Sequence, residues 1–93
     1  MDDPRYEWDE AKNRQNLAKH GFDFSKIAEF AWLDAVETLQ VVEGEVRWKA
    51  VGRLGERIVV VIYTERREKL RIISLREAEP REIGDYVKAK SQG

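Results

Sequence analysis

Residues 57–64 read RIVVVIYT, and this run is the part of the sequence that decides the fold class. Its centre, Ile58–Ile62, is apolar at every position, so a strand formed here has no face that is suited to water. Such a strand has to be covered on both sides. We therefore expect Ile58–Ile62 to be the central strand of a sheet.

Three more runs that are rich in β-branched and apolar residues lie before and after this segment. The turns between the runs are short and read Glu-Gly, Leu-Gly-Glu and Arg-Arg-Glu-Lys. Connections of this length join antiparallel neighbours, because a parallel crossover needs a much longer segment. The sequence thus predicts a four-stranded antiparallel sheet, with strands at 36–42, 47–53, 57–64 and 69–75.

Two helical segments are expected before the first of these strands. Asp9 is a suitable N-cap for a helix over residues 10–20, and Gly21 suits the left-handed position after the end of that helix. Ser25 can cap a second, short helix over residues 26–33, where apolar residues have helical spacing.

The C-terminal part predicts one more helix. Pro80 suits the first helical position, and the Glu82 side chain is placed to accept the amide of the capping residue. The order α-α-β-β-β-β-α, with the helices on one face of the sheet, defines an α+β domain. We assign residues 1–93 to a single domain, with a core over about 7–88 and a fraying tail at 89–93.

The residue composition excludes several kinds of site. Cysteine is absent, and His20 is the only histidine. Disulfides, cysteine-based zinc sites and multi-histidine metal sites are therefore excluded, and we expect neither a metal nor a cofactor. The N-terminus lacks the apolar core of a signal peptide, and the longest apolar run is far too short for a membrane span. We expect a cytoplasmic protein.

Charge is distributed unevenly along the chain, although the net charge is only −1. Residues 1–45 carry −6 and residues 46–93 carry +5, with +6 concentrated in residues 46–76. This asymmetry indicates a basic face for an anionic partner, and the alternative is a solvated surface of mixed charge. The pI of about 5.9 is below that of a dedicated nucleic-acid binder, so any such binding should be local.

Three motifs resemble the BrnT family of bacterial toxins. The first is EWDEAKN at residues 7–13, continued by Asn16, KHG at 19–21 and DF at 23–24. The second is Gly44-Glu45-x-Arg47, which leads into AVGR at 50–53. The third is VVIYTER at 60–66, followed by RIISLR at 71–76 and by Ala78, Glu82 and Tyr86. Together the motifs cover roughly residues 7–86.

The resemblance implies the RelE-like ribonuclease fold and a role in a type II toxin–antitoxin system. It implies a metal-independent endoribonuclease that cleaves RNA and thereby inhibits translation and growth. It also implies a protein partner, namely a BrnA-type antitoxin with a DNA-binding ribbon-helix-helix domain, in a heterotetramer of two toxins and two antitoxins.

Metal-free RNA cleavage uses the RNA's own 2′-hydroxyl as the nucleophile. A base takes its proton, cations stabilise the charge that develops on the phosphate, and an acid protonates the leaving oxygen. Arginine suits the second task because its fork pairs with phosphate oxygens. The resemblance implies that such residues lie on the open face of the sheet. The candidates for catalysis are Arg76, Glu65, Arg53, Lys49 and Tyr63, and those for RNA binding are Arg66, Arg71 and Arg47.

Strand alternation limits which of these residues can act together. Lys49 and Arg53 are four residues apart, so they share a face. Arg71 and Arg76 are five apart and would lie on opposite faces of a regular strand. Either Arg76 lies past the strand end, or a bulge intervenes, or only one of the two belongs to the site. We favour Arg76, because the polar residue Ser74 lies on the same face of the strand, whereas Ile73 and Leu75 look core-facing.

Some candidates also have structural interpretations. Glu65 is the best carboxylate base, and it could equally be a salt-bridge partner for Arg66 or Arg76. The position of His20 at a helix C-terminus favours capping or packing over acid–base catalysis. For the aromatic side chains we favour core or partner contacts over base stacking: Trp8, Trp32 and Trp48.

Two other functions compete with the enzyme. In one, the basic sheet face belongs to a non-catalytic module that binds RNA or the antitoxin. In the other, the chain is the structural half of a toxin–antitoxin complex whose enzymatic activity has decayed. Incubation of the purified protein with labelled RNA, with and without EDTA, separates these alternatives.

Overall fold

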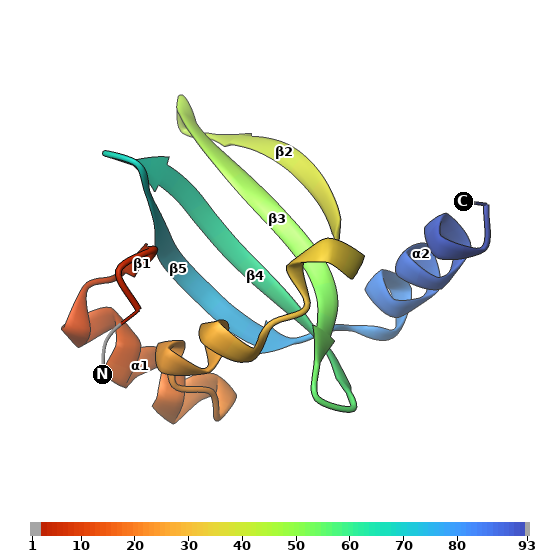
Figure 1. The fold of residues 1–93 in the computed structure, drawn as a ribbon, viewed down its shortest axis with the longest axis horizontal. Coiled ribbons are helices and arrows are strands. Elements are labelled where there is room, and N and C mark those ends of the chain that lie inside the picture. The colour runs from red at the N-terminus through yellow and green to blue at the C-terminus, as the bar shows by residue number, and fades with distance from the viewer. Residues whose placement is uncertain (1–2, 93) are drawn as a thin grey trace.

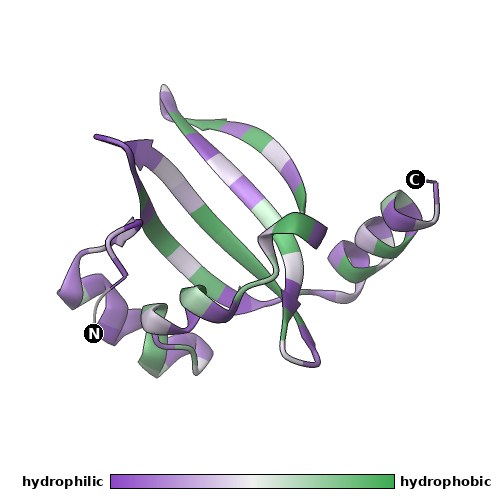
Figure 2. Cartoon of the chain, viewed as in Figure 1, coloured by the Kyte–Doolittle hydropathy of each residue, from purple (hydrophilic) through white to green (hydrophobic). Residues whose placement is uncertain are grey.

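The computed structural model describes residues 3–92, and its main feature is a twisted five-stranded sheet in the order β1-β5-β4-β3-β2 (Figure 1). The central position of β4 confirms the expectation for Ile58–Ile62. Figure 2 shows the middle of this strand as hydrophobic. The strands are β1 (Tyr6–Glu7), β2 (Val36–Val42), β3 (Glu45–Leu54), β4 (Arg57–Arg66) and β5 (Lys69–Glu77).

One strand was missed by the sequence analysis, so the expectation of a four-stranded, purely antiparallel sheet is wrong. The segment β1 pairs in parallel with β5, placing Tyr6 opposite Leu70 and Glu7 opposite Arg71. The Leu70 amide donates to the Arg5 carbonyl at 2.9 Å. The other pairings, β2 with β3, β3 with β4 and β4 with β5, are antiparallel as expected.

The first helix, α1 (Glu10–His20), has the expected bounds. The Asp9 carboxylate accepts the amides of Ala11 and Lys12, at 2.8 and 3.3 Å, and so caps the helix. Gly21 has a φ of 81°, which is the left-handed conformation that glycine adopts without steric cost.

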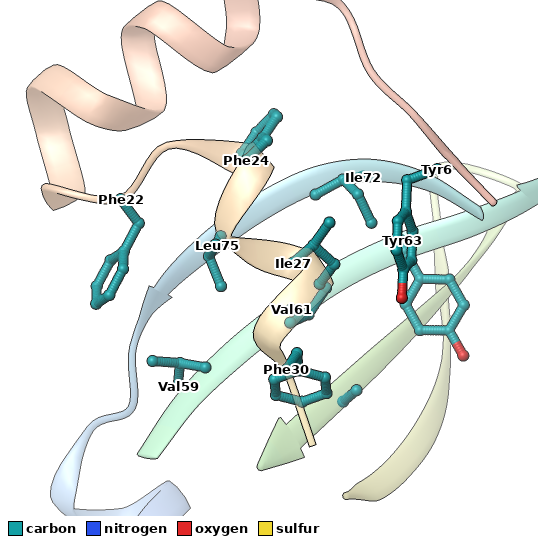
Figure 3. Packing of buried hydrophobic residues seen from close by; sticks show 11 residues of the cluster. Tyr6, Phe22, Phe24, Ile27, Phe30, Val59, Val61, Tyr63, Ile72 and Leu75 are labelled. Carbon is teal, nitrogen blue, oxygen red and sulfur yellow. The ribbon is translucent and has the colours of Figure 1, made fainter. Parts of the chain in front are cut away.

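The predicted helix over 26–33 is replaced by two 3₁₀ segments, η1 (Phe24–Glu29) and η2 (Trp32–Asp34). The cap is Asp23, whose carboxylate accepts the Ser25 amide at 2.9 Å, and not Ser25 itself. In a 3₁₀ turn, residues three apart lie above one another. This spacing turns Phe24 and Ile27 into the core, and Phe30 follows them in the chain (Figure 3).

The sheet has a separate core on each face. The larger core lies under η1 and contains Val59, Val61 and Leu75, all fully buried (Figure 3). The smaller core lies under the C-terminal helix α2 (Pro80–Ser91), where Tyr86 packs with Val60. The helices therefore cover both faces, and the expectation that they share one face is wrong for α2.

Asparagine side chains attach α1 to the free edge of β5. The Asn16 amide nitrogen donates to the Leu75 carbonyl at 2.8 Å, and its oxygen accepts the Leu75 amide at 3.2 Å. Asn13 instead attaches α1 to η1, because its side-chain oxygen accepts the Phe24 amide at 2.7 Å. Asn13 and Asn16 are the buried residues of α1, which explains why the helix lacks a strong apolar stripe.

Candidate active site

Lys49 and Arg76 lie on the face of the sheet that α2 partly covers. Lys49 is opposite Ile62, and Arg76 is opposite Val60. Ile62 and Val60 are two residues apart on β4, so both cationic residues share one face. The fold thus brings two of the predicted catalytic residues onto neighbouring positions around the central strand.

Both cations meet the carboxylate of Glu82 in the first turn of α2. Lys49 Nζ lies 2.6 Å from Glu82 Oε2. Arg76 donates from Nη1 to Oε1 at 2.8 Å and from Nη2 to Oε2 at 2.9 Å. Glu82 Oε1 also accepts the amide of the capping residue Glu79 at 2.9 Å, as predicted. One carboxylate therefore joins β3, β5 and α2.

These contacts favour the ionised forms of Glu82 and Arg76. Hydrogen bonds from Arg76 hold the pKa of Glu82 well below its ordinary value of 4.5, and the Glu79 amide and Lys49 act in the same direction. The same pairing raises the pKa of Arg76. At neutral pH the cluster consequently holds two cations and one anion, with a net charge of +1.

Arg76 keeps donors that the protein does not use. Its Nη1 donates to Glu82 and to the Glu77 carbonyl, and its Nη2 donates to Glu82. A guanidinium has five N–H groups in a planar fork. Within residues 3–92, the Nε–H and the second Nη2–H of Arg76 have no acceptor, and they point the same way along one edge of the fork. This edge can bind two oxygens of a phosphate.

A groove of about 260 Å³ adjoins the cluster between β2, β3 and α2. Its walls are mostly apolar, and Lys49 and Glu82 supply charged groups at them. The lining side chains are Val36, Thr38, Gln40, Lys49, Val51, Glu82, Asp85 and Tyr86.

A β-bulge decides the relation between Arg71 and Arg76. The β4–β5 register shifts between Ile62 and Tyr63, so that one residue of β5, Ile73, has no partner. The extra residue shifts the alternation of β5 by one position, so Arg71 and Arg76 lie on the same face of the sheet although they are five residues apart. Arg71 lies at the far end of that face, where it pairs with Glu7 at 2.9 Å.

Three other predicted arginines belong to the same face but stand apart from the cluster. Arg47 is two positions from Lys49, and its Nε lies 3.5 Å from Glu45 Oε1. That Nε is shielded from solvent and has no hydrogen-bond acceptor within the described residues. Arg66 is exposed at the end of β4. Arg53 lines a different hollow, with Asp34, Tyr86, Val87, Lys90 and Ser91.

Tyr63 and Glu65 alternate onto the opposite face of β4. Tyr63 is buried, its ring packs edge-on against Trp32 at 5.2 Å, and its hydroxyl donates to Glu37. Burial and the neighbouring Glu37 raise the pKa of Tyr63. Glu65 is exposed near the strand end. The structure therefore does not bring these two residues together with Arg76.

His20 is a half-buried residue at the C-terminal end of α1. Burial lowers its pKa from 6.5, and the positive charges of Lys19 and Arg76 lower it further. The imidazole is therefore neutral at neutral pH. The tryptophans pack against the larger core: Trp8, Trp32 and Trp48.

A family model described as "Ribonuclease toxin, BrnT, of type II toxin-antitoxin system" matches residues 8–82. The chain belongs to the BrnT toxin family. As a BrnT toxin it is the ribonuclease component of a type II toxin–antitoxin system, with RNA as its substrate and an antitoxin as its partner. No match is found among curated proteins.

The part of the chain that matches the BrnT family begins at Trp8 and ends at Glu82. It therefore includes all three members of the charged cluster. Sequence reasoning gave Glu82 a capping role only, and its part in the cluster was missed. The available signal was the place of Glu82 in the third BrnT motif, on the first turn of the helix that follows Arg76.

Two further observations concern residues 3–92 alone. None of the helices found there is long and apolar enough to cross a membrane. In the same part of the chain, no three histidine or acidic side chains come together in a group that could hold a metal ion.

Proposed function

We propose that this BrnT toxin is a cytoplasmic, metal-independent endoribonuclease whose reacting centre is the Arg76–Lys49 pair. The observation that carries the proposal is the convergence of two cations on one carboxylate, with one edge of the Arg76 fork left unused. A phosphate at that edge would lie beside the Lys49 charge. Cleavage of cellular RNA there would inhibit translation and growth.

The positions of the charges support the following reaction. The 2′-hydroxyl of the RNA gives its proton to water and attacks the adjacent phosphorus, the bond to the 5′-oxygen of the next nucleotide breaks, and water returns a proton to that oxygen. The products are a 2′,3′-cyclic phosphate and a 5′-hydroxyl. Arg76 and Lys49 stabilise the negative charge that grows on the phosphate oxygens. Glu82 positions both cations.

Other arginines of the same face extend the binding surface. We propose that Arg47, Arg66 and Arg71 contact the RNA backbone on either side of the cleaved bond. We leave Arg53, Tyr63 and Glu65 out of the proposed reacting centre, since Arg53 lies in a separate hollow and the other two alternate onto the opposite face. The mechanism therefore rests on charge stabilisation by Arg76 and Lys49, with no step assigned to Glu65.

The proposed antitoxin is of the BrnA type, with a ribbon-helix-helix domain, and the complex is a heterotetramer of two toxins and two antitoxins. The BrnT family membership supports the antitoxin partner on which this proposal builds. We place the antitoxin over the basic sheet face or its rim, where an acidic segment would neutralise the cations and exclude RNA.

Purified toxin incubated with end-labelled RNA in EDTA tests the reaction. Cleavage should persist in EDTA, leave 2′,3′-cyclic phosphate ends, and disappear when the antitoxin is added. An Arg76→Ala variant, expressed and purified in the same way, controls for contaminating nucleases. If the wild type binds RNA without cutting it, the chain is a binding module. If cutting requires a divalent metal, the metal-independent mechanism is wrong.

A further inference from the structure

A second cationic hollow lies on the other side of β5, between that strand and α1. Its volume is about 240 Å³, and it is separate from the groove beside Glu82. It is lined by Lys12, Gln15, Asn16, Lys19, His20 and Ile73, so it contains no acidic side chain.

The fold builds this hollow from three features already described. Lys12 and Lys19 are seven residues apart on α1, or about two helical turns, so they point to the same side of the helix. Asn16 lies between them and fixes the helix to the backbone of Leu75. The floor is Ile73, the extra residue of the bulge.

Charge in the hollow is uncompensated. Lys12 and Lys19 belong to none of the ion pairs found within residues 3–92, whereas Lys49 and Lys90 each have a carboxylate partner. His20 adds a neutral imidazole, and Gln15 adds an amide that can donate hydrogen bonds. These groups together suit an anion with several oxygen atoms.

The hollow also adjoins the proposed reacting centre. Ile73 and Arg76 are three residues apart on β5, which is about 10 Å along a strand. The positive charge of Arg76 repels a proton on His20 and so contributes to the lowered pKa of His20. A chain that carries phosphates at regular intervals could therefore contact Arg76 and the hollow at the same time.

We propose that Lys12 and Lys19 form a subsite for a phosphate of the RNA strand that flanks the one held by Arg76. This inference rests on the proposed function, because it takes the Arg76 cluster as the place of the cleaved bond. The ligand is a phosphodiester of single-stranded RNA, held by two point charges and by the donors of Gln15 and His20. The bulge at Ile73 opens the space that the phosphate occupies.

Binding of a non-cleavable probe tests the subsite independently of cleavage. A fluorescent 2′-O-methyl RNA oligonucleotide is titrated with toxin over a range of salt concentrations. Lys12→Gln/Lys19→Gln is compared with Lys26→Gln/Lys88→Gln, which removes the same charge from exposed positions outside both sites. A lost phosphate contact should lower the slope of log K against log salt by about 0.7, together with the affinity. The control pair should leave this slope unchanged.

Two outcomes would overturn the subsite. In the first, the Lys12/Lys19 variant keeps the wild-type salt slope. In the second, it binds RNA normally and loses only the capture of the antitoxin, which would make the hollow a docking point for an acidic protein segment. Thermal melting by circular dichroism verifies that both double variants are folded. Failure of RNA cleavage by the wild type in EDTA would count against the proposed function and leave this binding result interpretable.

Discussion

Arg76 donates from both terminal nitrogens to the two carboxylate oxygens of Glu82, at 2.8 and 2.9 Å. The pair connects the last strand to the first turn of α2, and Lys49 joins it from β3 at 2.6 Å. Because Glu82 also accepts the amide at the helix cap, the orientation of Arg76 depends on how α2 begins. The orientation of the Arg76 guanidinium and the docking of α2 are therefore coupled.

Arg76→Ala should relieve growth arrest and lower RNA cleavage by about 10²–10³, because a preorganised contact to the developing charge is lost. Arg76→Lys should also be impaired, since a point charge cannot pair with Glu82 and a phosphate through one planar fork. Growth after induction and single-turnover cleavage measure the effect, with circular dichroism and an antitoxin pull-down as controls for folding. Full toxicity of Arg76→Ala would mean that the active site lies elsewhere.

Glu82→Gln should change how stability depends on pH. The pKa of Glu82 is lower in the folded state than its ordinary 4.5. Its ion pairs therefore stabilise the fold fully above pH 4.5, and this stabilisation declines as the pH falls from 4.5 towards the lowered pKa. We expect the variant to lose about 1–3 kcal/mol of unfolding free energy at pH 7 and less at pH 3. Urea unfolding at both values measures this. Glu56→Gln, in the exposed turn after β3, is the matched control, and an equal loss at both pH values would contradict the prediction.

Val60→Asp should unfold the domain, because Val60 is fully buried in the central strand and an unpaired buried charge costs several kcal/mol. Val87→Asp makes the same chemical change in α2, where the side chain is 56% exposed, and should leave the fold intact. Far-UV circular dichroism and thermal melting compare the two. A Val60→Asp protein with an unchanged melting temperature would contradict the buried position.

His20→Gln should keep most of the toxicity. The imidazole is neutral at neutral pH, and glutamine retains a hydrogen-bond donor at the same place. The measurement is growth after induction, with the Arg76→Ala strain as the inactive reference. If His20→Gln alone abolishes toxicity in a folded protein, the imidazole takes part in proton transfer and the arginine-centred mechanism is wrong.

Asn16→Ala should destabilise the domain by about 1–3 kcal/mol, because the buried amide and carbonyl of Leu75 both lose their partner. Gln15→Ala, at the adjacent exposed position of α1, should have little effect on the free energy of unfolding. Urea denaturation of the two variants measures the difference. Equal stabilities would mean that water replaces the side-chain amide at the strand edge.

The central strand and the capped helices α1 and α2 could be predicted because their signals are local. An unbroken apolar run and the residue types at helix ends require no knowledge of distant contacts. By contrast, β1 has only two residues, and its pairing with β5 depends on where the sheet places Leu70. Two residues are too few to show a hydrophobic period, so no pattern in the sequence could reveal this strand.

The residue types of the candidate site could be predicted from the sequence, but the register of the strands that carry them could not. Arg71 and Arg76 are an odd number of residues apart, and the sequence left a bulge as one of three ways to accommodate this spacing. Only the pairing of β4 with β5 selects the bulge. Tyr63 and Glu65 lie in the third motif and in β4, yet strand alternation turns them to the face opposite Arg76. Glu82 both caps α2 and pairs with Arg76. Its spacing from Glu79 indicates the cap, whereas its place in the third motif was the only sequence signal for the pairing.

The two edges of the sheet differ in their capacity to accept another strand. Asn16 satisfies both backbone groups of Leu75, and β1 pairs with the other end of β5, so this edge is closed to further pairing. Within residues 3–92, β2 is the last strand on the opposite side, with Leu39, Val41 and Val42 exposed. An open, apolar edge is the usual template for strand addition. Any growth of this sheet by a second polypeptide is therefore directed to one side only, and amide hydrogen exchange in β2 would report it.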